Sequence, residues 1–390
     1  MNRCAWRAAT AALWLAMLLA GCGRESPQPT AASAAAAAPA PDVAGVPMDA
    51  QKVLNIYNWS DYIDPTVVPA FEKEYGIKVN YDVFDSNEVV ETKLLAGHTG
   101  YDLVVPSASF MQRQIQAGVF QRLDKSLLPN LKNLDPAITQ ILQVYDPGNQ
   151  YGVNYLWGTS GVGYNQARID QAMPNAPVDS LAMFYDPNVV KNFKACGVSI
   201  IDAPDEVVGT VLIFLGRNAN SESVDDLKAA EQVLLAIRPY VRYINSSRYI
   251  DDLANGELCL ALGWNGDVGQ ARARAKENGK DVQIKYNIAR EGAVMFFDML
   301  AIPADASHPK NAHLFINYLL RPEVAAKNSA LMHYATSNAA AYSLIDPAIY
   351  NDRGVYPSEA QKAHLYPNAT HSLVYTRELN RTWTRFKTGQ

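Results

Sequence analysis

The sequence predicts an α/β fold arranged as two lobes. From residue 53 onward, short apolar runs alternate with stretches of helical period, and this alternation is typical of α/β proteins. Tyr151–Tyr164 is a long extended stretch with four glycines, which fits a strand crossing between lobes, and Val282–Ile288 is a second candidate crossing. Two crossings make each lobe discontinuous. We expect residues 52–157 and about 288–325 in lobe 1, and residues 158–286 and about 330–390 in lobe 2.

The first expected unit is a strand, a helix and a second strand. Val53–Trp59 and Ile77–Phe84 are the strands. Asp64 and Pro65 fit the N-cap and first residue of the helix, although Pro69 lacks a backbone N–H and a start near Pro69 is the alternative; Gly76 ends the helix. Such units are parallel with a right-handed crossover. In open sheets, ligands lie beyond the carboxyl ends of the strands. At that end the chain carries Trp59, Ser60, Asp61 and Tyr62.

Strands and helices continue to alternate to the C-terminus. Further strands are expected at Tyr101–Pro106, Val198–Asp202, Tyr243–Ile244, Glu257–Trp264 and Ala293–Pro303. Helices are expected at Asn87–Gly97, Phe110–Ala117, Arg168–Met173, Leu181–Phe184, Val189–Phe193, Val207–Leu215, Asp225–Arg238, Tyr249–Ala254, Val268–Lys276, Asn311–Leu319 and Glu323–Met332. In the helix at Asn87, we expect Val89, Val90, Leu94 and Leu95 to share the buried face.

The N-terminus reads as a targeting segment. Arg3 and Arg7 precede the short apolar run Ala8–Ala20, which predicts a signal peptide over residues 1–21. The sequence Leu-Ala-Gly-Cys ending at Cys22 resembles a bacterial lipobox, which implies cleavage before Cys22 and a lipid on its thiol. The alternative is an ordinary secretory signal followed by an incidental cysteine. Residues 22–50 are rich in Ala and Pro and predict a disordered tether.

Two cysteines remain for the folded part, Cys196 and Cys259. An even pair in an exported chain favours a disulfide, which would contribute about 4 kcal/mol through chain entropy. A catalytic thiol is the alternative.

The net charge of −5 without a basic block argues against a nucleic-acid partner. The six histidines lack the i, i+4 spacing of metal ligands, so we expect no metal site.

Four strand ends share a composition of aromatic residues, hydroxyls and carboxylates. They begin at Trp59, Ser107, Trp264 and Phe296, and Glu206 follows a fifth strand. A plainer interpretation makes the aromatics core residues and the acids helix caps. Asp298 does not fit this plainer interpretation, because it interrupts an apolar strand and has no Lys or Arg near it in sequence. A buried carboxylate needs a partner. Aromatics and acids around one cleft would form a cage for an alkylammonium ion.

The motifs resemble those of the periplasmic polyamine-binding proteins of ABC importers, most closely the putrescine-binding branch. The matching stretches are YNWSDYI (57–63), FEKEYGIKVNYDVFDSNEVVETKLLAG (71–97), GYDLVVPSASF (100–110), DPGNQYGVNYLWGTSGVGYN (146–165), CGVSIIDAPDEV (196–207), RYINSSRYIDDLANGELCLALGWNGDVGQA (242–271), EGAVMFFDMLAIPADA (291–306) and NYLLRPEVAA (317–326). The resemblance implies a two-lobed type II fold of mixed sheets with a hinge that closes on the ligand. It also implies a monomeric, non-enzymatic binding protein without cofactor, which is lipid-anchored in the periplasm and delivers its ligand to an inner-membrane permease.

The resemblance also assigns roles by position. It makes Asp267 and Asp298 the two ammonium anchors, Trp59 and Phe296 walls along the methylenes, and Tyr334 the residue that closes the box. The remaining expected ligand contacts are Ser60, Asp61, Tyr62, Ser107, Glu206 and Trp264. Cys196 and Cys259 fall where this branch has a disulfide. Close relatives often have Ala at the position of Asn265. We therefore expect the hydrogen bonds around the ligand-contacting residues to differ from those of the relatives.

Two questions stay open at this point. The ligand class includes spermidine, cadaverine and agmatine, although Ser109, Ala203 and Phe296 favour putrescine because spermidine-preferring members carry bulkier or acidic residues there. The chain can also be a ligand sensor for a surface receptor, or an enzyme on the same fold. Against an enzyme, the sequence has no G-x-S-x-G, H-E-x-x-H, P-loop or G-x-G-x-x-G motif.

Overall fold

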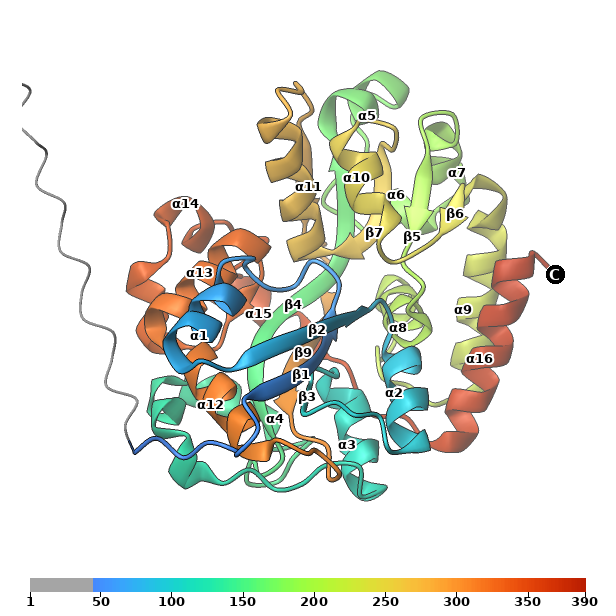
Figure 1. The fold of residues 1–390 in the computed structure, drawn as a ribbon. Coiled ribbons are helices and arrows are strands. Elements are labelled where there is room, and N and C mark those ends of the chain that lie inside the picture. Colours follow the sequence, from blue (N-terminus) through green and yellow to red (C-terminus); the bar gives the residue numbers. More distant parts are fainter. Residues whose placement is uncertain (1–44) are drawn as a thin grey trace, which may run out of the picture. The chain divides into compact units, whose positions relative to one another are not determined.

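A computed structural model describes residues 45–390 (Figure 1). The expected signal peptide 1–21, Cys22 and the tether up to residue 44 lie outside the described residues. Within residues 45–390, no helix combines the length and apolarity needed to cross a membrane. Helices and strands alternate along this part of the chain, as expected of an α/β protein.

Eleven strands in the described residues join in one mixed sheet. Eight of them follow the order β2-β1-β3-β9-β4-β7-β5-β6; β8 and β10 pair with β4, and β11 pairs with β9. Their bounds are β1 Val53–Trp59, β2 Lys78–Phe84, β3 Leu103–Val104, β4 Gly152–Asn165, β5 Val198–Ile200, β6 Tyr243–Ile244, β7 Leu260–Trp264, β8 Ile284–Asn287, β9 Ala293–Ala301, β10 Ala335–Thr336 and β11 Leu365–Pro367.

Sixteen α-helices surround this sheet in the same part of the chain. Their bounds are α1 Val67–Tyr75, α2 Asn87–Ala96, α3 Ala108–Gln116, α4 Pro136–Leu142, α5 Gln166–Ala172, α6 Ala182–Tyr185, α7 Pro187–Val190, α8 Pro204–Phe214, α9 Val224–Ile237, α10 Arg248–Ala254, α11 Asn265–Glu277, α12 Pro309–Leu319, α13 Pro322–Met332, α14 Pro347–Tyr350, α15 Glu359–Lys362 and α16 Leu373–Thr388. Short 3₁₀ turns, η1 Lys125–Leu127, η2 Pro129–Asn133, η3 Lys191–Phe193, η4 Arg238–Tyr240 and η5 Ala339–Leu344, connect them.

The first strand–helix–strand unit is confirmed, with β1 and β2 parallel in full register from Val53 opposite Lys78 to Trp59 opposite Phe84. The expected helix start at Pro65 is wrong, since α1 begins at Val67 with Thr66 as its N-cap. The Asp64 carboxylate instead accepts bonds from the Thr66 amide at 2.8 Å and the Thr66 hydroxyl, closing a turn ahead of the helix. At the other end Gly76 adopts a left-handed φ of 65° and ends α1 as expected.

The buried face of α2 is narrower than expected. Asn87, Val90 and Leu94 are buried, whereas Val89 and Leu95 are exposed. The buried residues repeat every three or four positions and so form one stripe, and Val89 and Leu95 lie on its flanks. The strand expected at Tyr101–Pro106 is likewise reduced to β3, Leu103–Val104.

Two long strands run through the middle of the sheet. All fourteen residues of β4 are buried; it pairs with β9 along Gly152–Ser160 and with β7 along Ser160–Tyr164. The second crossing was expected at Val282–Ile288, but β8 pairs only with the Val162–Asn165 end of β4. The strand that runs beside β4 through the middle of the sheet is β9. The second crossing was therefore expected at β8, one strand before the strand that the structure places there.

The buried side chains form three clusters, which we name by their centres. The β7 core surrounds Leu260 and includes α8, α9 and residues of α16. The β1 core surrounds Leu54 with α1 and α12, and the β3 core surrounds Val104 with Trp157 and Phe297. Cys196 and Cys259 form the expected disulfide, with 5.5 Å between their Cα atoms, at the β7 core.

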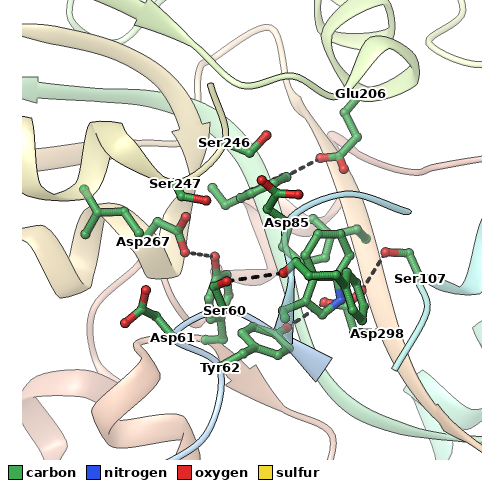
Figure 2. A pocket seen from close by; sticks show the side chains of 16 residues that line it. Ser60, Asp61, Tyr62, Asp85, Ser107, Glu206, Ser246, Ser247, Asp267 and Asp298 are labelled. Atoms are coloured by element: carbon green, nitrogen blue, oxygen red, sulfur yellow. Dashed lines mark hydrogen bonds between the residues drawn. The ribbon is translucent and has the colours of Figure 1, made fainter. Parts of the chain in front are cut away.

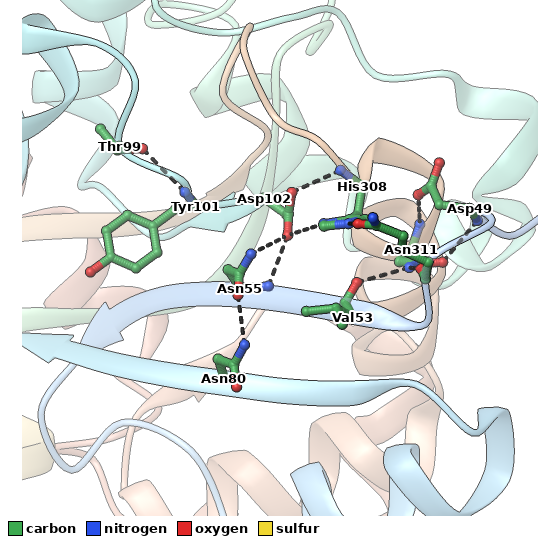
Figure 3. A network of polar contacts seen from close by, with 10 residues as sticks. Asp49, Val53, Asn55, Asn80, Thr99, Tyr101, Asp102, His308 and Asn311 are labelled. Carbon is green, nitrogen blue, oxygen red and sulfur yellow. Dashed lines mark hydrogen bonds and ion pairs between the residues drawn. The ribbon is translucent and has the colours of Figure 1, made fainter.

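The start of the described chain is held by a polar network beside α12 (Figure 3). The buried Asp102 carboxylate accepts from the Asn55 amide, the Asn55 side chain, and the His308 amide and ring, at 2.8–3.1 Å. Asn311 exchanges hydrogen bonds with Asp49 and donates to the Gln51 and Val53 carbonyls. These bonds fix the segment that leads into β1, and thereby the strand that carries Trp59.

Candidate functional site

A cavity of about 500 Å³, counted with its open mouth, lies where the carboxyl ends of several strands meet. It is lined by Trp59, Ser60, Asp61, Tyr62, Phe84, Asp85, Ser107, Glu206, Ser246, Ser247, Ile250, Trp264, Asp267, Phe296, Asp298 and Tyr334. All eleven residues that the sequence nominated for ligand contact are among them. In Figure 2, Asp267 and Asp298 lie on opposite sides of the view, with other lining side chains between them.

Strand ends and helix starts position these side chains. Trp59 ends β1, and Ser60–Tyr62 form the loop that follows. Ser107 occupies the N-cap position of α3, and Glu206 lies in the first turn of α8. The end of β7 and the start of α11 contribute Trp264 and Asp267. Phe296 and Asp298 belong to β9, and Tyr334 precedes β10.

Asp298 is buried, with 3% of its surface exposed. Its carboxylate accepts one hydrogen bond from the Ser107 hydroxyl at 2.6 Å and one from the Tyr62 hydroxyl at 2.7 Å. Burial raises the pKa of Asp298 to about 6, although the bonds from Ser107 and Tyr62 favour the charged form. The Ser107 side chain therefore serves this carboxylate and makes no cap bond to α3, although Ser107 occupies the N-cap position of that helix.

Asp267 has a similar environment at the other side of the cavity. It is 8% exposed and accepts bonds from the Tyr334 hydroxyl at 2.6 Å and the Tyr249 hydroxyl at 2.8 Å. Burial raises the pKa of Asp267 to about 6 against the effect of both tyrosines. Asp267 also lies in the first turn of α11, where the helix dipole favours a negative charge.

Neither anchor carboxylate forms an ion pair within the described protein, although the charge of the nearby Arg274 acts to lower the pKa of Asp267. Among residues 45–390, no ion pair includes Asp267 or Asp298, and every hydrogen-bond partner of their carboxylates is a neutral hydroxyl. Two buried carboxylates in one cavity repel each other and are poorly solvated, unless cationic groups enter between them. The cavity is thus built for positive charge.

Glu206 is the third buried carboxyl. Its Oε2 accepts from the Trp264 ring nitrogen at 2.9 Å and from the Ser160 hydroxyl. Burial and the charge of Asp205 raise the pKa of Glu206 to about 8. This carboxyl is therefore protonated more readily than an exposed glutamate, and it adds hydrogen-bonding capacity to the cavity.

Aromatic rings line the wall between the two anchors in a continuous series. Trp59 meets Trp264 edge-on at 5.9 Å between ring centroids, and Trp264 meets Phe296 at 6.4 Å. Tyr334 meets Phe296 at 6.0 Å and Tyr62 at 5.1 Å, again edge-on. Such contacts hold the rings rigid, and their faces offer apolar surface for methylene groups and favourable electrostatics for ammonium groups.

Asp61 lies at the exposed rim of the cavity. Its side chain is half-exposed, and its backbone has a positive φ of 52°. Its carboxylate pairs with Arg274 of α11 at 2.9 Å, and the same guanidinium pairs with Asp251 of α10 at 2.8 Å. We name Asp61, Arg274 and Asp251 the rim ion pairs. Asp61 therefore has a cationic partner in the protein, although it shares the single charge of Arg274 with Asp251.

Five lining residues were not predicted from the sequence: Phe84, Asp85, Ser246, Ser247 and Ile250. A signal existed for the first two, because Phe84 ends β2 and Asp85 follows it, repeating the aromatic–acid pattern of the nominated strand ends. Asn265, the expected departure, accepts a bond from the Thr159 amide at 2.9 Å and so ties α11 to β4. Among the described residues, no group of three or more His, Cys, Asp or Glu is placed to hold a metal ion.

Comparison with known proteins gives consistent matches. The profile of the family described as bacterial extracellular solute-binding protein matches residues 66–355. The putrescine-binding periplasmic protein SpuD of Pseudomonas aeruginosa is 49% identical over 350 residues, which covers 89% of this chain and 95% of that protein. The putrescine-binding periplasmic protein PotF of Escherichia coli is 50% identical over 342 residues, covering 87% of this chain and 92% of the relative.

A solved structure is similar in fold. The spermidine/putrescine ABC transporter substrate-binding protein PotD from Streptococcus pneumoniae, in complex with calcium and HEPES, superposes with a TM-score of 0.70 at 28% identity. The match covers 86% of this chain and 99% of that one.

Proposed function

The chain belongs to the family of bacterial extracellular solute-binding proteins, and from that premise we propose that it is the substrate-binding component of a polyamine ABC importer with putrescine as its ligand. The observation that carries the proposal is the pair of buried, unpaired carboxylates, Asp267 and Asp298, in an aromatic-walled cavity. The fold agrees with the type II binding-protein fold of its relatives. Their names describe binding proteins, which favours neither the sensor nor the enzyme alternative.

Putrescine consists of two ammonium groups joined by four methylenes. Each close ammonium–carboxylate pair is worth about 4 kcal/mol at an effective dielectric constant near 20, before desolvation is subtracted. Cation–π contacts add roughly 1 kcal/mol each. Micromolar affinity needs about 8 kcal/mol in total, so two anchors and an aromatic wall are enough.

We assign the site residues to three tasks. Asp267 and Asp298 anchor the ammonium groups, and the hydroxyls of Tyr334, Tyr249, Ser107 and Tyr62 aim these carboxylates. Trp59, Trp264 and Phe296 cover the methylenes. Ser60 and Glu206 complete the lining as hydrogen-bonding groups, and Asp61 acts from the rim.

We infer that two lobes with the boundaries predicted above close over this ligand. In support, Asp267 belongs to a helix that packs in the β7 core, whereas Tyr62 and Tyr334 belong to the β1 core. The rim ion pairs join Asp61, after β1, to α11 and α10. One revision follows from the packing of the tail: Ala341, Ile345 and Tyr356 lie in the β3 core, whereas α16 and Tyr366 of β11 pack in or against the β7 core.

We also propose that the protein acts in the periplasm as a monomer anchored through a lipid on Cys22 and presents its ligand to an inner-membrane permease. The lipobox-like sequence ending at Cys22 and the periplasmic relatives support this. Mass spectrometry of the mature N-terminal peptide tests the anchor: a diacylglyceryl group on Cys22 is expected, and a Cys22→Ser variant should be released from membranes.

Isothermal titration of residues 45–390 tests the ligand. Saturable 1:1 binding of putrescine is expected, with cadaverine, spermidine and agmatine as the comparison set. If all four amines fail to bind while the protein is folded, the proposed function is wrong.

A further inference from the structure

A separate cavity lies next to the register shift between β4 and β9. Its lining includes leucines, among them Leu134, Leu156 and Leu300, and three asparagines, Asn154, Asn328 and Asn338. Each asparagine is at most 2% exposed. A buried amide in an apolar setting is costly unless both of its ends are hydrogen-bonded.

Each amide uses only one end within the described protein. Asn154 donates through Nδ2 to the carbonyls of Leu156 and Asp298, each at 3.0 Å. Asn328 accepts at Oδ1 from the Asp64 amide at 2.9 Å, and Asn338 donates through Nδ2 to the Leu320 carbonyl at 2.8 Å. The other ends, Asn154 Oδ1, Asn338 Oδ1 and Asn328 Nδ2, are buried without a partner among residues 45–390.

These three atoms match the bonding capacity of one water molecule. Water donates two hydrogen bonds, which the two amide oxygens can accept, and its oxygen can accept from one of the two N–H groups of Asn328 Nδ2. A metal or ammonium ion would leave the N–H of Asn328 facing a cation, and an anion would face two oxygen atoms. The donor and acceptor count thus selects a neutral molecule that both donates and accepts.

The same cluster reaches the ligand cavity through Asn154. The register of β4 against β9 shifts there: Asn154 lies opposite Met299 and Leu156 opposite Asp298, which leaves Tyr155 as an extra residue. Such a bulge turns side chains and leaves backbone groups unpaired. The side-chain amide of Asn154 donates hydrogen bonds to two backbone carbonyls at this bulge, and one of them is the carbonyl of Asp298.

The cluster also reaches the loop that carries Tyr62, the hydroxyl partner of Asp298. Asn328 holds the Asp64 amide, two residues after Tyr62. From the bulge, the Tyr155 hydroxyl donates to the Tyr62 carbonyl at 2.9 Å. Residues of the cluster and of the bulge therefore hold both the backbone of Asp298 and the loop that carries its tyrosine partner.

We propose that Asn154 is a positioning residue for the Asp298 anchor, and that one internal water molecule, bound by Asn154, Asn328 and Asn338, links the β4 bulge to α13 and to the segment before η5. The positioning part rests on the proposed function, because it concerns the affinity that Asp298 provides. The water part is independent of any ligand.

A double-mutant cycle on the mature chain tests the positioning part by calorimetry with putrescine. Asn154→Ala should weaken binding about tenfold in the wild-type background and less than about threefold in an Asp298→Asn background, because Asn154 acts by placing the carboxylate that the second background lacks. Asn154→Ser, whose hydroxyl can still donate to one carbonyl, should fall between. Equal losses in both backgrounds, or no loss in the wild-type background, overturn the role.

The matched control is Asn149→Ala. Asn149 also has a buried amide oxygen without a partner among the described residues, but its donor end binds the Thr139 carbonyl and not the anchor. The affinity of the Asn149→Ala variant for putrescine should match that of the wild type. If Asn154→Ala does not fold, the Asn154→Ser cycle decides. A wild type that binds no putrescine refutes the proposed function, not the water.

A crystal structure of the wild-type protein at high resolution tests the water part. Density for one water within hydrogen-bond distance of Asn154 Oδ1, Asn338 Oδ1 and Asn328 Nδ2 is expected. A cavity without density, or amide groups turned to bond one another, would refute it.

Discussion

The Tyr62 hydroxyl donates a 2.7 Å hydrogen bond to the Asp298 carboxylate across 236 positions of sequence, and both groups are buried. Tyr62 belongs to the loop after β1, whereas Asp298 belongs to the long strand β9. Asp298 lies within β9 and not at its end, so the bond joins the loop after one strand to the middle of another. It aims a carboxylate that has no cationic partner in the described protein into the cavity.

Removing either anchor should reduce putrescine affinity strongly. Asp267→Ala and Asp298→Ala each leave one buried ammonium group unpaired, so each should cost at least about 2 kcal/mol, or roughly thirtyfold in Kd. Calorimetry on the folded variants measures this. Asp281→Ala, which removes an exposed carboxylate outside the cavity, is the control for net charge. Wild-type affinity in both anchor variants would contradict the assignment.

Affinity should fall in acid. Burial raises the pKa values of Asp267 and Asp298 to about 6, so below this pH the free protein holds protons that a dication must displace. Kd should rise steadily from pH 6 to pH 5, and Glu206, whose pKa is raised to about 8, should add a separate change above pH 7. Titrations in buffers of different ionisation enthalpy should detect proton release in the acidic range. A flat profile down to pH 5 would contradict ligand contact with these carboxylates.

The anchors should destabilise the ligand-free protein at neutral pH. The pKa of Asp298 is raised from 3.8 to about 6 in the folded protein, so folding favours the protonated carboxyl. This contribution to the unfolding free energy is complete below pH 4, and it is lost as the pH rises through 6 and the buried group becomes charged. At pH 8, Asp298→Asn should therefore raise the unfolding free energy by about 1–2 kcal/mol while it weakens binding. Thermal unfolding measures the difference, which should shrink towards pH 4. A less stable variant at pH 8 would show that the bonds from Ser107 and Tyr62 outweigh burial.

The rim ion pairs should affect release more than stability. Arg274 and Asp61 are partly exposed, and exposed pairs contribute about 0–1 kcal/mol. If they hold the closed state, Arg274→Gln should speed putrescine dissociation about threefold with a small change in melting temperature. Stopped-flow fluorescence of Trp59 and Trp264 reports it. The Lys362→Gln change, which breaks an exposed pair remote from the cavity, serves as the reference.

Loss of the disulfide should lower stability without changing the site. Cys196 and Cys259 lie at the β7 core, away from the lining residues, and cross-linking a loop of this length contributes about 4 kcal/mol. The Cys196→Ser, Cys259→Ser double variant should unfold at lower denaturant concentration and bind putrescine with unchanged Kd at low temperature. A change in Kd without loss of stability would reverse this interpretation.

Much of the candidate site was predictable because its parts are local. Trp59, Ser107 and Trp264 each follow a run of strand-forming residues, and parallel strands deliver their carboxyl ends to one edge. Asp298 was conspicuous as a charge inside an apolar strand. The errors were local too: α1 starts later than Asp64 and Pro65 suggested, because the Asp64 carboxylate binds Thr66 and closes a separate turn.

The sequence by itself determined the element types, the α/β class and the residue types gathered at the strand ends, since these depend on periodicity and local chemistry. Only the tertiary structure decided which groups serve each carboxylate: Tyr249 and Tyr334 for Asp267, Ser107 and Tyr62 for Asp298, and Arg274 for Asp61. It also decided that β9 and not β8 runs beside β4 through the middle of the sheet. Such partners are set by the path of the whole chain, because hydrogen bonds and ion pairs form between neighbours in space and no local pattern records them.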